Sequence, residues 1–157
     1  MEITFRPMTM EDAQMVFEWL NDKETRASSV ETQPVVWEKH IEWLKKNMGD
    51  PNYHLDIAMV NDVPVGYFRM KRLKDPTLGS HGYTSYILGP HFRGHGYGKA
   101  LVHAYVARWP HLPIILEVRA NNAASVHIIR SLPNIQELEP RTLADGSILL
   151  KFLRNAT

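Results

Sequence analysis

The chain has 157 residues, of which 44% are hydrophobic and 22% are charged, a balance typical of a globular protein. Its 18 basic and 17 acidic residues give a net charge of +1, which argues against a nucleic-acid-binding or membrane-surface protein. Cysteine is absent, which excludes disulfides and a thiolate nucleophile. The length fits one domain over residues 1–157.

Neither targeting signals nor metal-binding patterns stand out in the sequence. Residues 1–6 lack the basic and apolar segments of an export signal, and no apolar run approaches the ~18 residues of a membrane span. The eight histidines show no H-x-x-x-H spacing on one helix, so no metal site is predicted. We expect a cytoplasmic protein, either a monomer or a homodimer, that binds neither nucleic acid nor membrane.

The first part of the chain predicts a strand, two helices and an antiparallel meander. Apolar residues alternate in the strands and recur at helical spacing in the helices. A strand is predicted over 3–6, followed by a helix capped by Thr9, a loop over 23–34 and a helix opened by Pro34. Three strands follow over 55–59, 65–71 and 83–88, and a loop over 74–82 joins the last two.

The second part predicts a crossover and a terminal hairpin. A helix over 98–108 precedes the apolar run Ile114–Val118, which is typical of a central strand buried on both faces. A helix over 123–132 follows, and Asp145-Gly146 is a turn between two pairing segments. The whole order predicts an α+β protein, with a central mixed sheet and helices on both faces.

The alternating glycines Gly94, Gly96 and Gly98 stand between a predicted strand and a helix. Glycines let a backbone approach a ligand closely, and the free N–H groups of a helix N-terminus favour a phosphate. Arg93 and Lys99 add positive charge at the rim. A P-loop is excluded because Ala100 follows Lys99, and the spacing is not that of the dinucleotide fingerprint. A tight turn without a ligand is the alternative.

With this context the segment resembles the GNAT superfamily of N-acetyltransferases. The family signature is Arg or Gln, two residues, Gly, one residue, then Gly or Ala, and Arg93, Gly96 and Gly98 match it. The preceding Gly89-Pro90-His91-Phe92 resembles the family's lead-in, and the predicted order of elements resembles the family fold along nearly the whole chain. The resemblance implies a GNAT-like fold and acetyl-CoA as co-substrate.

The same resemblance implies where CoA binds. Backbone N–H groups of the loop would hold its pyrophosphate, and a strand edge would pair with the pantetheine amides. Asn122 and Ser125 fit a second family segment, in which the Asn contacts the pantetheine arm; the alternative is that Asn121 or Asn122 caps the following helix. The implied cofactor residues are Ile87, Leu88, Gly89, Arg93, Gly94, His95, Gly96, Tyr97, Gly98, Lys99, Asn122 and Ser125.

Acetyl transfer to an amine needs a neutral amine and a polarised thioester carbonyl, for which a backbone N–H near Leu88 is the candidate donor. Glu117, a carboxylate in an apolar strand, is the first candidate base, and the alternative is a structural or solvated carboxylate. His81, which could face the cleft, and His127 are secondary candidates, and the alternatives are a loop histidine and a helix-surface histidine. Many family members carry a Tyr proton donor where this chain has Ile129, so a dedicated general acid is in doubt.

The prediction of the acceptor rests on a weaker resemblance. Residues 17–22 and Arg26 resemble a branch that includes amino-sugar, ribosomal-protein and polyamine acetyltransferases. We expect the primary amine of a small molecule, with an amino-sugar nucleotide favoured, bound by Arg26, Tyr83 and Ser85. Thr84 and Tyr86, on the other side of the same strand, are the alternative lining of the acceptor cleft. The alternatives are a protein N-terminus or a polyamine as acceptor, a silent CoA-binding module, and an unrelated nucleotide-phosphate binder. Arg26 could also be a solvated surface charge.

Overall fold

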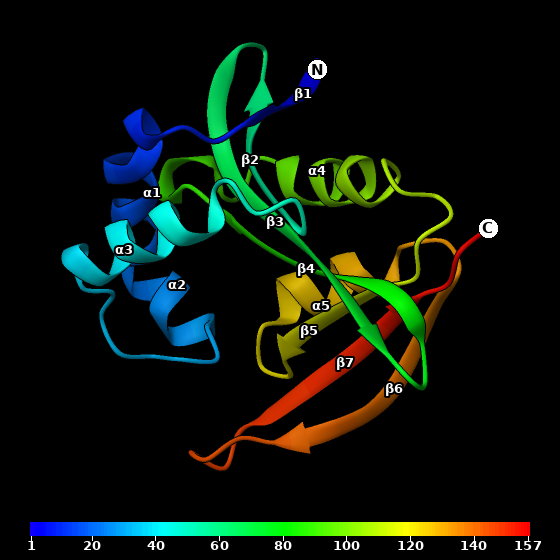
Figure 1. The fold of residues 1–157 in the computed structure, drawn as a ribbon. Helices are drawn as coiled ribbons and strands as arrows, with labels where there is room; N and C mark the ends of the chain where they lie inside the picture. Colours follow the sequence, from blue (N-terminus) through cyan, green and yellow to red (C-terminus); the bar gives the residue numbers. More distant parts are fainter.

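A computed structural model describes residues 1–157. Its strands are β1 (Ile3–Pro7), β2 (Tyr53–Val60), β3 (Val63–Asp75), β4 (Gly79–Leu88), β5 (Ile114–Arg119), β6 (Ile135–Thr142) and β7 (Ile148–Arg154). They form one seven-stranded sheet in the order β1-β2-β3-β4-β5-β7-β6 (Figure 1). All neighbours are antiparallel except β4 and β5, which confirms the predicted mixed sheet.

Helices cover both faces of this sheet, as predicted. The helices are α1 (Ala13–Leu20), α2 (Lys23–Ser28), α3 (Trp37–Asn47), α4 (Tyr97–Val106) and α5 (Ala123–Arg130), with 3-10 turns η1 (Met10–Asp12) and η2 (Pro90–Phe92). Helices α1 to α3 gather on one side of the sheet, and α4 and α5 lie on the other (Figure 1). None of these helices has the length and apolar character that spanning a lipid bilayer requires.

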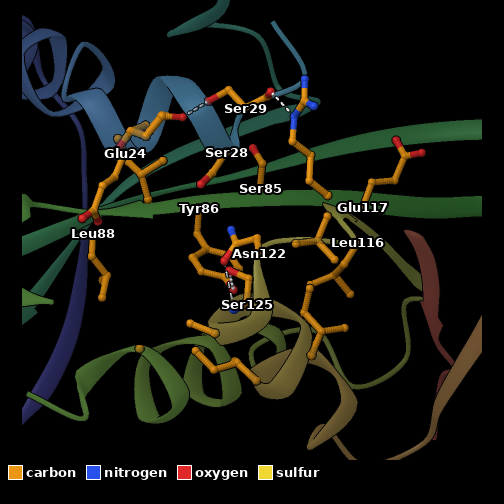
Figure 2. A pocket seen from close by; sticks show the side chains of 18 of the residues that line it. Glu24, Ser28, Ser29, Ser85, Tyr86, Leu88, Leu116, Glu117, Asn122 and Ser125 are labelled. Carbon is orange, nitrogen blue, oxygen red and sulfur yellow. Dashed lines mark hydrogen bonds between the residues drawn. The ribbon is translucent and has the colours of Figure 1, made fainter. Parts of the chain in front are cut away.

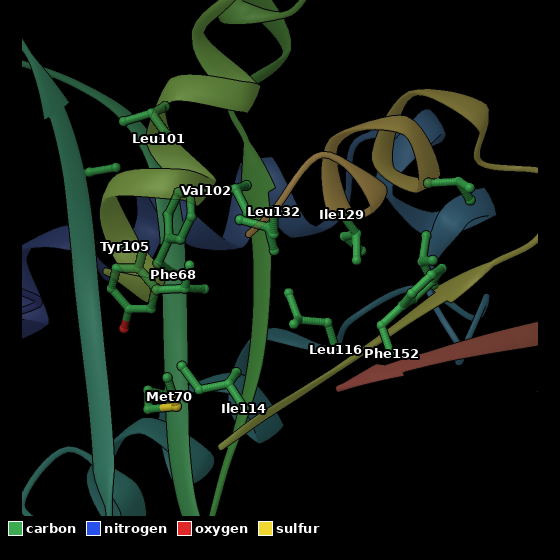
Figure 3. Packing of buried hydrophobic residues seen from close by; sticks show 14 of the residues in the cluster. Phe68, Met70, Leu101, Val102, Tyr105, Ile114, Leu116, Ile129, Leu132 and Phe152 are labelled. Carbon is green, nitrogen blue, oxygen red and sulfur yellow. The ribbon is translucent and has the colours of Figure 1, made fainter. Parts of the chain in front are cut away.

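Strand alternation divides the apolar residues between two cores. Tyr67 packs with Val16 and Leu44 on the α1–α3 side, while its neighbour Phe68 packs with Tyr105 and Leu116 on the α4–α5 side (Figure 3). Successive strand side chains point to opposite faces, so a sheet covered on both faces needs apolar residues at consecutive positions. The burial of β5, where only Glu117 among six residues is not fully buried, confirms the prediction of a central strand.

The parallel pair β4–β5 separates partway along its length. Strand β4 pairs with β3 from Gly79 to Leu88, but with β5 only from Gly82 to Thr84. Beyond Thr84 and its partner Leu116, the two strands diverge, and β5 continues its pairing with β7 alone. The divergence leaves one edge of β4 without a neighbour, and this edge opens into a cavity.

The prediction of a loop over 74–82 is wrong, because most of these residues belong to strands. Strands β3 and β4 continue as a two-stranded ribbon to Asp75 and Gly79, so only residues 76–78 form the connection. Asp75 accepts hydrogen bonds from the amides of Thr77 and Leu78, and Gly79 has φ +66°. The Pro, Gly and Ser residues of this segment therefore form a tight hairpin rather than a long loop.

The predicted loop over 23–34 contains helix α2. Asp22 caps this helix by accepting a hydrogen bond from the amide of Thr25 at 3.3 Å. The next helix, α3, begins at Trp37 rather than at Pro34, because Val35 is held in an extended connection by two hydrogen bonds to the Asn21 side chain. A six-residue helix has too few turns to show apolar periodicity.

Candidate active site

A cavity of about 910 Å³ lies where β4 and β5 diverge. Figure 2 shows Ser85 and Glu117 on its α2 side, and Tyr86, Asn122 and Ser125 on its α5 side. The predicted site residues that line it are Arg26, Tyr83, Ser85, Ile87, Leu88, Arg93, Gly94, Gly96, Tyr97, Gly98, Lys99, Glu117, Asn122 and Ser125. Gly89 and His95 were predicted to bind the cofactor but are not among its lining residues. The fold thus gathers nearly all the predicted residues around one space.

The glycine loop forms the end of the cavity at the N-terminus of α4. Gly94 and Gly96 have φ angles of +76° and +78°, and Gly96 is the residue that precedes the helix. The amides of Gly94, His95 and Gly96 donate no hydrogen bond within the chain, and the first turn of any helix leaves its N–H groups free. These donors, with the positive end of the α4 dipole, form a site suited to a phosphate.

Gly98 serves packing rather than an unusual backbone conformation. A Cβ atom at this position would lie 3.0 Å from Cδ1 of Ile128 on α5, and its φ is not positive. The glycine therefore lets α4 and α5 approach each other beside the loop. Lys99 is exposed at the cavity rim and forms no ion pair.

The side chain of Arg93 is engaged by residues at the start of α2. Its guanidinium pairs with Asp22 at 2.7 Å and Glu24 at 3.1 Å, and it donates to Oγ1 of Thr25 at 2.7 Å. These contacts join the glycine loop to the start of α2 and help lower the pKa of Asp22. Arg93 was predicted to add charge at the phosphate site; within the chain its guanidinium is paired with two carboxylates and braces the loop against α2.

The open edge of β4 presents the backbone groups of alternate residues. The amide of Gly82 donates toward β5, to Pro113 O, whereas the amide of Gly89 donates toward β3, to Val65 O. Because backbone N–H groups alternate along a strand, those of Tyr86 and Leu88 face the open edge. This arrangement supports Leu88 as a backbone donor, but not Ile87 or Gly89, which face β3.

Gly89 has a steric role instead. A Cβ atom there would lie 2.8 Å from the indole of Trp19, so the glycine allows α1 to pack against the end of β4.

Residues of α5 form the wall opposite the open edge. Oδ1 of Asn122 accepts a hydrogen bond from the amide of Ser125 at 3.3 Å, which confirms that Asn122 caps α5, and its Nδ2 has no partner within the chain. The hydroxyls of Ser125 and Tyr86 lie 2.8 Å apart. Burial raises the pKa of Tyr86 to about 12, so this phenol is protonated at neutral pH. Tyr86 was predicted only as one of an alternative pair, with Thr84, for the lining of the acceptor cleft, and both residues line the cavity. Ile129 is buried in the core.

Glu117 lies across the cavity from the open edge of β4, with 13% of its side chain exposed. Its Oε1 accepts a hydrogen bond from the Tyr83 hydroxyl at 3.0 Å, and its Oε2 lies 3.5 Å from Nε of Arg141. Burial and the neighbouring carboxylate raise the pKa of Tyr83, which stays a hydrogen-bond donor. This arrangement holds a carboxylate at a fixed place in the cavity, as a general base requires.

The two secondary base candidates lie in different places. His127 is exposed on α5 and lines the cavity. His81 is buried near the end of the β3–β4 ribbon, with Nδ1 3.0 Å from Gly79 O and Nε2 3.7 Å from Asp75, and it does not line the cavity. The hypothesis that His81 faces the cleft is therefore wrong. No group of three or more His, Asp or Glu side chains is placed to hold a metal ion.

Arg26 serves the loop that walls the cavity. Its Nε donates to Leu20 O at 2.6 Å, Nη1 donates to the carbonyls of Glu31 and Gln33, and Nη2 donates to Oγ of Ser29 at 3.2 Å. Arg26 was expected to be either an acceptor ligand or a solvated surface charge. Instead, its guanidinium is occupied by hydrogen bonds within the chain. Its side chain fastens the α2–α3 connection to the end of α1.

We expect Arg26→Ala to lower the free energy of unfolding by about 1–3 kcal/mol, because the loop loses charge-assisted hydrogen bonds. Urea unfolding measures this loss, with Lys23→Ala, an exposed residue of the same helix, as control. A phosphate ligand would behave differently: the variant would keep its stability and raise the KM of phosphorylated acceptors alone. That result would contradict the structural role.

Arg119, at the end of β5, is a buried cation of the cavity wall that the sequence analysis did not single out. It is 4% exposed, donates to the carbonyls of Ser29 and Val30, and pairs with Asp145 at 3.0 Å. It thus ties the α2–α3 connection to β5 and to the β6–β7 turn. Its position in an apolar strand was the available signal, because a charge buried there needs partners.

Arg69 and Tyr67 on β3 also line the cavity and were not predicted as site residues. Nε of Arg69 donates to Oγ of Ser85, its partner across the β3–β4 pair, at 3.0 Å. Tyr67 is buried, yet its hydroxyl has no hydrogen-bond partner within the chain, and burial raises its pKa to about 12. Their alternation on a predicted strand was the signal that could have placed both on the face of Ser85.

Solved structures share this fold. A spermidine N-acetyltransferase from Vibrio cholerae, in complex with CoA and spermine, has a TM-score of 0.83 and 14% identity over 96% of this chain and 94% of that one. The aminoglycoside acetyltransferase AAC(6')-Ib, in complex with ribostamycin and coenzyme A, has a TM-score of 0.77 and 21% identity over 99% and 94%. At these identities, the likeness shows a shared fold.

A third structure, a ribosomal L7/L12 alpha-N-protein acetyltransferase in complex with coenzyme A, has a TM-score of 0.80 and 13% identity over 98% of this chain and 94% of that one. No curated protein matches the chain in sequence. The model of the acetyltransferase (GNAT) domain matches residues 2–132, most of the chain. With the glycine loop at the N-terminus of α4 and the diverging strands β4 and β5, this match shows that the chain belongs to the GNAT family of acetyltransferases.

Proposed function

We propose that this acetyltransferase moves an acetyl group from acetyl-CoA to the primary amine of a small molecule. One observation carries the proposal: a single cavity joins the free amides of the glycine loop, the open edge of β4 and the largely buried carboxylate of Glu117. One ligand-sized space can therefore hold the phosphates of CoA, the amides of its pantetheine arm and the amine of the acceptor.

Each part of the cavity has a task in this reaction. The amides from Gly94 onward bind the diphosphate, and the N–H groups of Tyr86 and Leu88 pair with the pantetheine arm or polarise the thioester carbonyl. The Asn122 amide, free at Nδ2, contacts the same arm. When bound, acetyl-CoA supplies the acetyl group as an activated thioester.

Two side chains on opposite sides of the sheet, Glu117 and Tyr86, carry out the proton transfers. Glu117 accepts a proton from the acceptor ammonium, directly or through a water, because only the neutral amine attacks the carbonyl carbon. As the C–N bond forms and the C–S bond breaks, the thiolate needs a proton. The protonated hydroxyl of Tyr86, bonded to Ser125, is the candidate donor on the α5 side. The new amide nitrogen loses its second proton to water, and solvent returns one proton to Tyr86, so that the transfers balance.

The acceptor is a small amine held over the sheet face that carries Tyr83 and Ser85. An amino-sugar nucleotide remains within this class, and the predicted phosphate ligand, Arg26, is already engaged in the wall of the cavity. A peptide N-terminus or a polyamine is the competing acceptor.

A thiol-release assay with acetyl-CoA and a panel of amines tests the proposal. The panel contains amino-sugar nucleotides, amino acids, polyamines, aminoglycosides and peptides with a free N-terminus. We expect turnover with at least one small amine, and a rise in Tm with CoA but not with ATP. Stabilisation by CoA without turnover of any amine would identify a silent CoA-binding module, and stabilisation by ATP alone would overturn the cofactor assignment.

A further inference from the structure

Arg69 is a cation of the cavity that no carboxylate of the chain neutralises. Arg93 and Arg119 both form ion pairs, and Arg26 is engaged by backbone carbonyls. Arg69 forms no ion pair, and only its Nε has an acceptor, the Ser85 hydroxyl. Its Nη1 and Nη2 atoms therefore have hydrogen-bonding capacity to spare, in a partly buried place.

The guanidinium of Arg69 is held in a defined position. Its Cζ lies 5.4 Å from the ring centroid of Trp43 and 5.9 Å from that of Tyr67, within the range of cation–π interactions. Together with the bond from Nε to Ser85, these aromatic contacts restrict the planar group. A fixed guanidinium with free Nη donors matches a carboxylate or phosphate, which it binds through two parallel hydrogen bonds.

Arg69 also shares a sheet face with the proposed base. Arg69 is paired with Ser85 across β3 and β4, and the parallel register that places Thr84 beside Leu116 puts Ser85 and Glu117 at the same level on either side of the divergence. Arg69 and Ser85 stand on paired strands, which are ~4.8 Å apart, and Glu117 lines the same cavity across the divergence, so a small molecule above Ser85 lies between the two charged side chains. The unpartnered Tyr67 hydroxyl lies on the same face.

We propose that Arg69 binds an anionic group of the acceptor, a carboxylate or a phosphate, while Glu117 receives its amine. The acceptor is thus a small dipolar molecule, with its acidic group within a few bonds of the amine that is acetylated. This inference rests on the proposed function. Amino acids and amino-sugar phosphates fit this description. Polyamines and aminoglycosides do not, because they carry only positive charges.

Matched acceptors test the inference and separate the two anions. Amino acids are compared with their amides, and glucosamine 6-phosphate with glucosamine, by kcat/KM in the thiol-release assay. We expect the acidic member of at least one pair to be preferred by about 10- to 100-fold, the range of one charge-assisted hydrogen-bonded contact. Preference in the first pairs indicates a carboxylate, and preference in the second indicates a phosphate.

The variant Arg69→Gln should remove this preference, by lowering kcat/KM for the acidic acceptor about 10- to 100-fold and leaving the neutral one nearly unchanged. Arg69→Lys should restore part of the loss. Arg72→Gln, an exposed position on the opposite face of the same strand, is the matched control. The rise in Tm caused by CoA should be the same in all three variants, which shows that the fold and the cofactor site are intact.

Equal rates for acidic and neutral acceptors in the wild type, or an equal loss for both in Arg69→Gln, would overturn the inference. Calorimetry of each acceptor with the CoA-loaded protein decides the same question without turnover. A protein that binds acidic amines through Arg69 but acetylates none would refute the proposed function and keep the anion site. A protein that acetylates cationic amines equally well would keep the function and refute the site.

Discussion

Gly96→Val is expected to weaken CoA binding about 5- to 150-fold. Gly96 has φ +78°, a conformation that costs a residue with a side chain about 1–3 kcal/mol, and each 1.4 kcal/mol is a tenfold change in affinity. No atom lies within 4 Å of a Cβ at this position, so the effect comes from the backbone rather than from a steric clash inside the chain. The strained loop would relax and lose the convergence of its free amides.

Calorimetry with CoA measures the loss, and Gly146→Val provides a matched control. Gly146 lies in the turn between β6 and β7 with φ +85°, and a Cβ there also meets no atom within 4 Å. Both variants should lose a similar amount of stability, but only Gly96→Val should lose affinity for CoA. Equal CoA affinity in the wild type and both variants would show that the loop does not bind the cofactor.

Glu117→Gln is expected to lower kcat at neutral pH by about 10²- to 10⁴-fold, the usual effect of removing a general base. The Gln amide oxygen can still accept the hydrogen bond from Tyr83, so the local geometry is preserved while the basic group is lost. The affinity for CoA should remain unchanged, because Glu117 lies on the acceptor side of the cavity.

Rates measured across a pH range check this prediction, with Arg141→Gln and Glu137→Gln as controls. Arg141→Gln removes the ion pair of Glu117 but keeps its carboxylate, and Glu137 is an exposed carboxylate that pairs with Arg130 on the surface. Neither control should lower kcat comparably. A normal rate and pH profile in Glu117→Gln, together with a lower Tm, would mean that Glu117 is structural.

The sequence by itself determined the features that depend on neighbouring residues. Apolar alternation and helical spacing predicted the order of most elements, and the glycines at 94 and 96 marked backbone conformations that other residues rarely adopt. A cap at Asn121 or Asn122 was predicted in the same way, and the structure places it at Asn122. These signals act over a few residues along the chain, so they do not require knowledge of the remaining structure.

The partners of the charged side chains were decided only by the tertiary structure. Arg93 meets Glu24 across 69 positions of sequence, and Arg119 meets Ser29 across 90, so neither contact leaves a local pattern. The same holds for Arg69, whose cation–π contact with Trp43 follows from the packing of α3 on the sheet and whose lack of a carboxylate partner leaves no local pattern either. The sequence shows where an arginine stands but not what its guanidinium binds, because its role depends on which acceptors the fold brings within hydrogen-bonding distance.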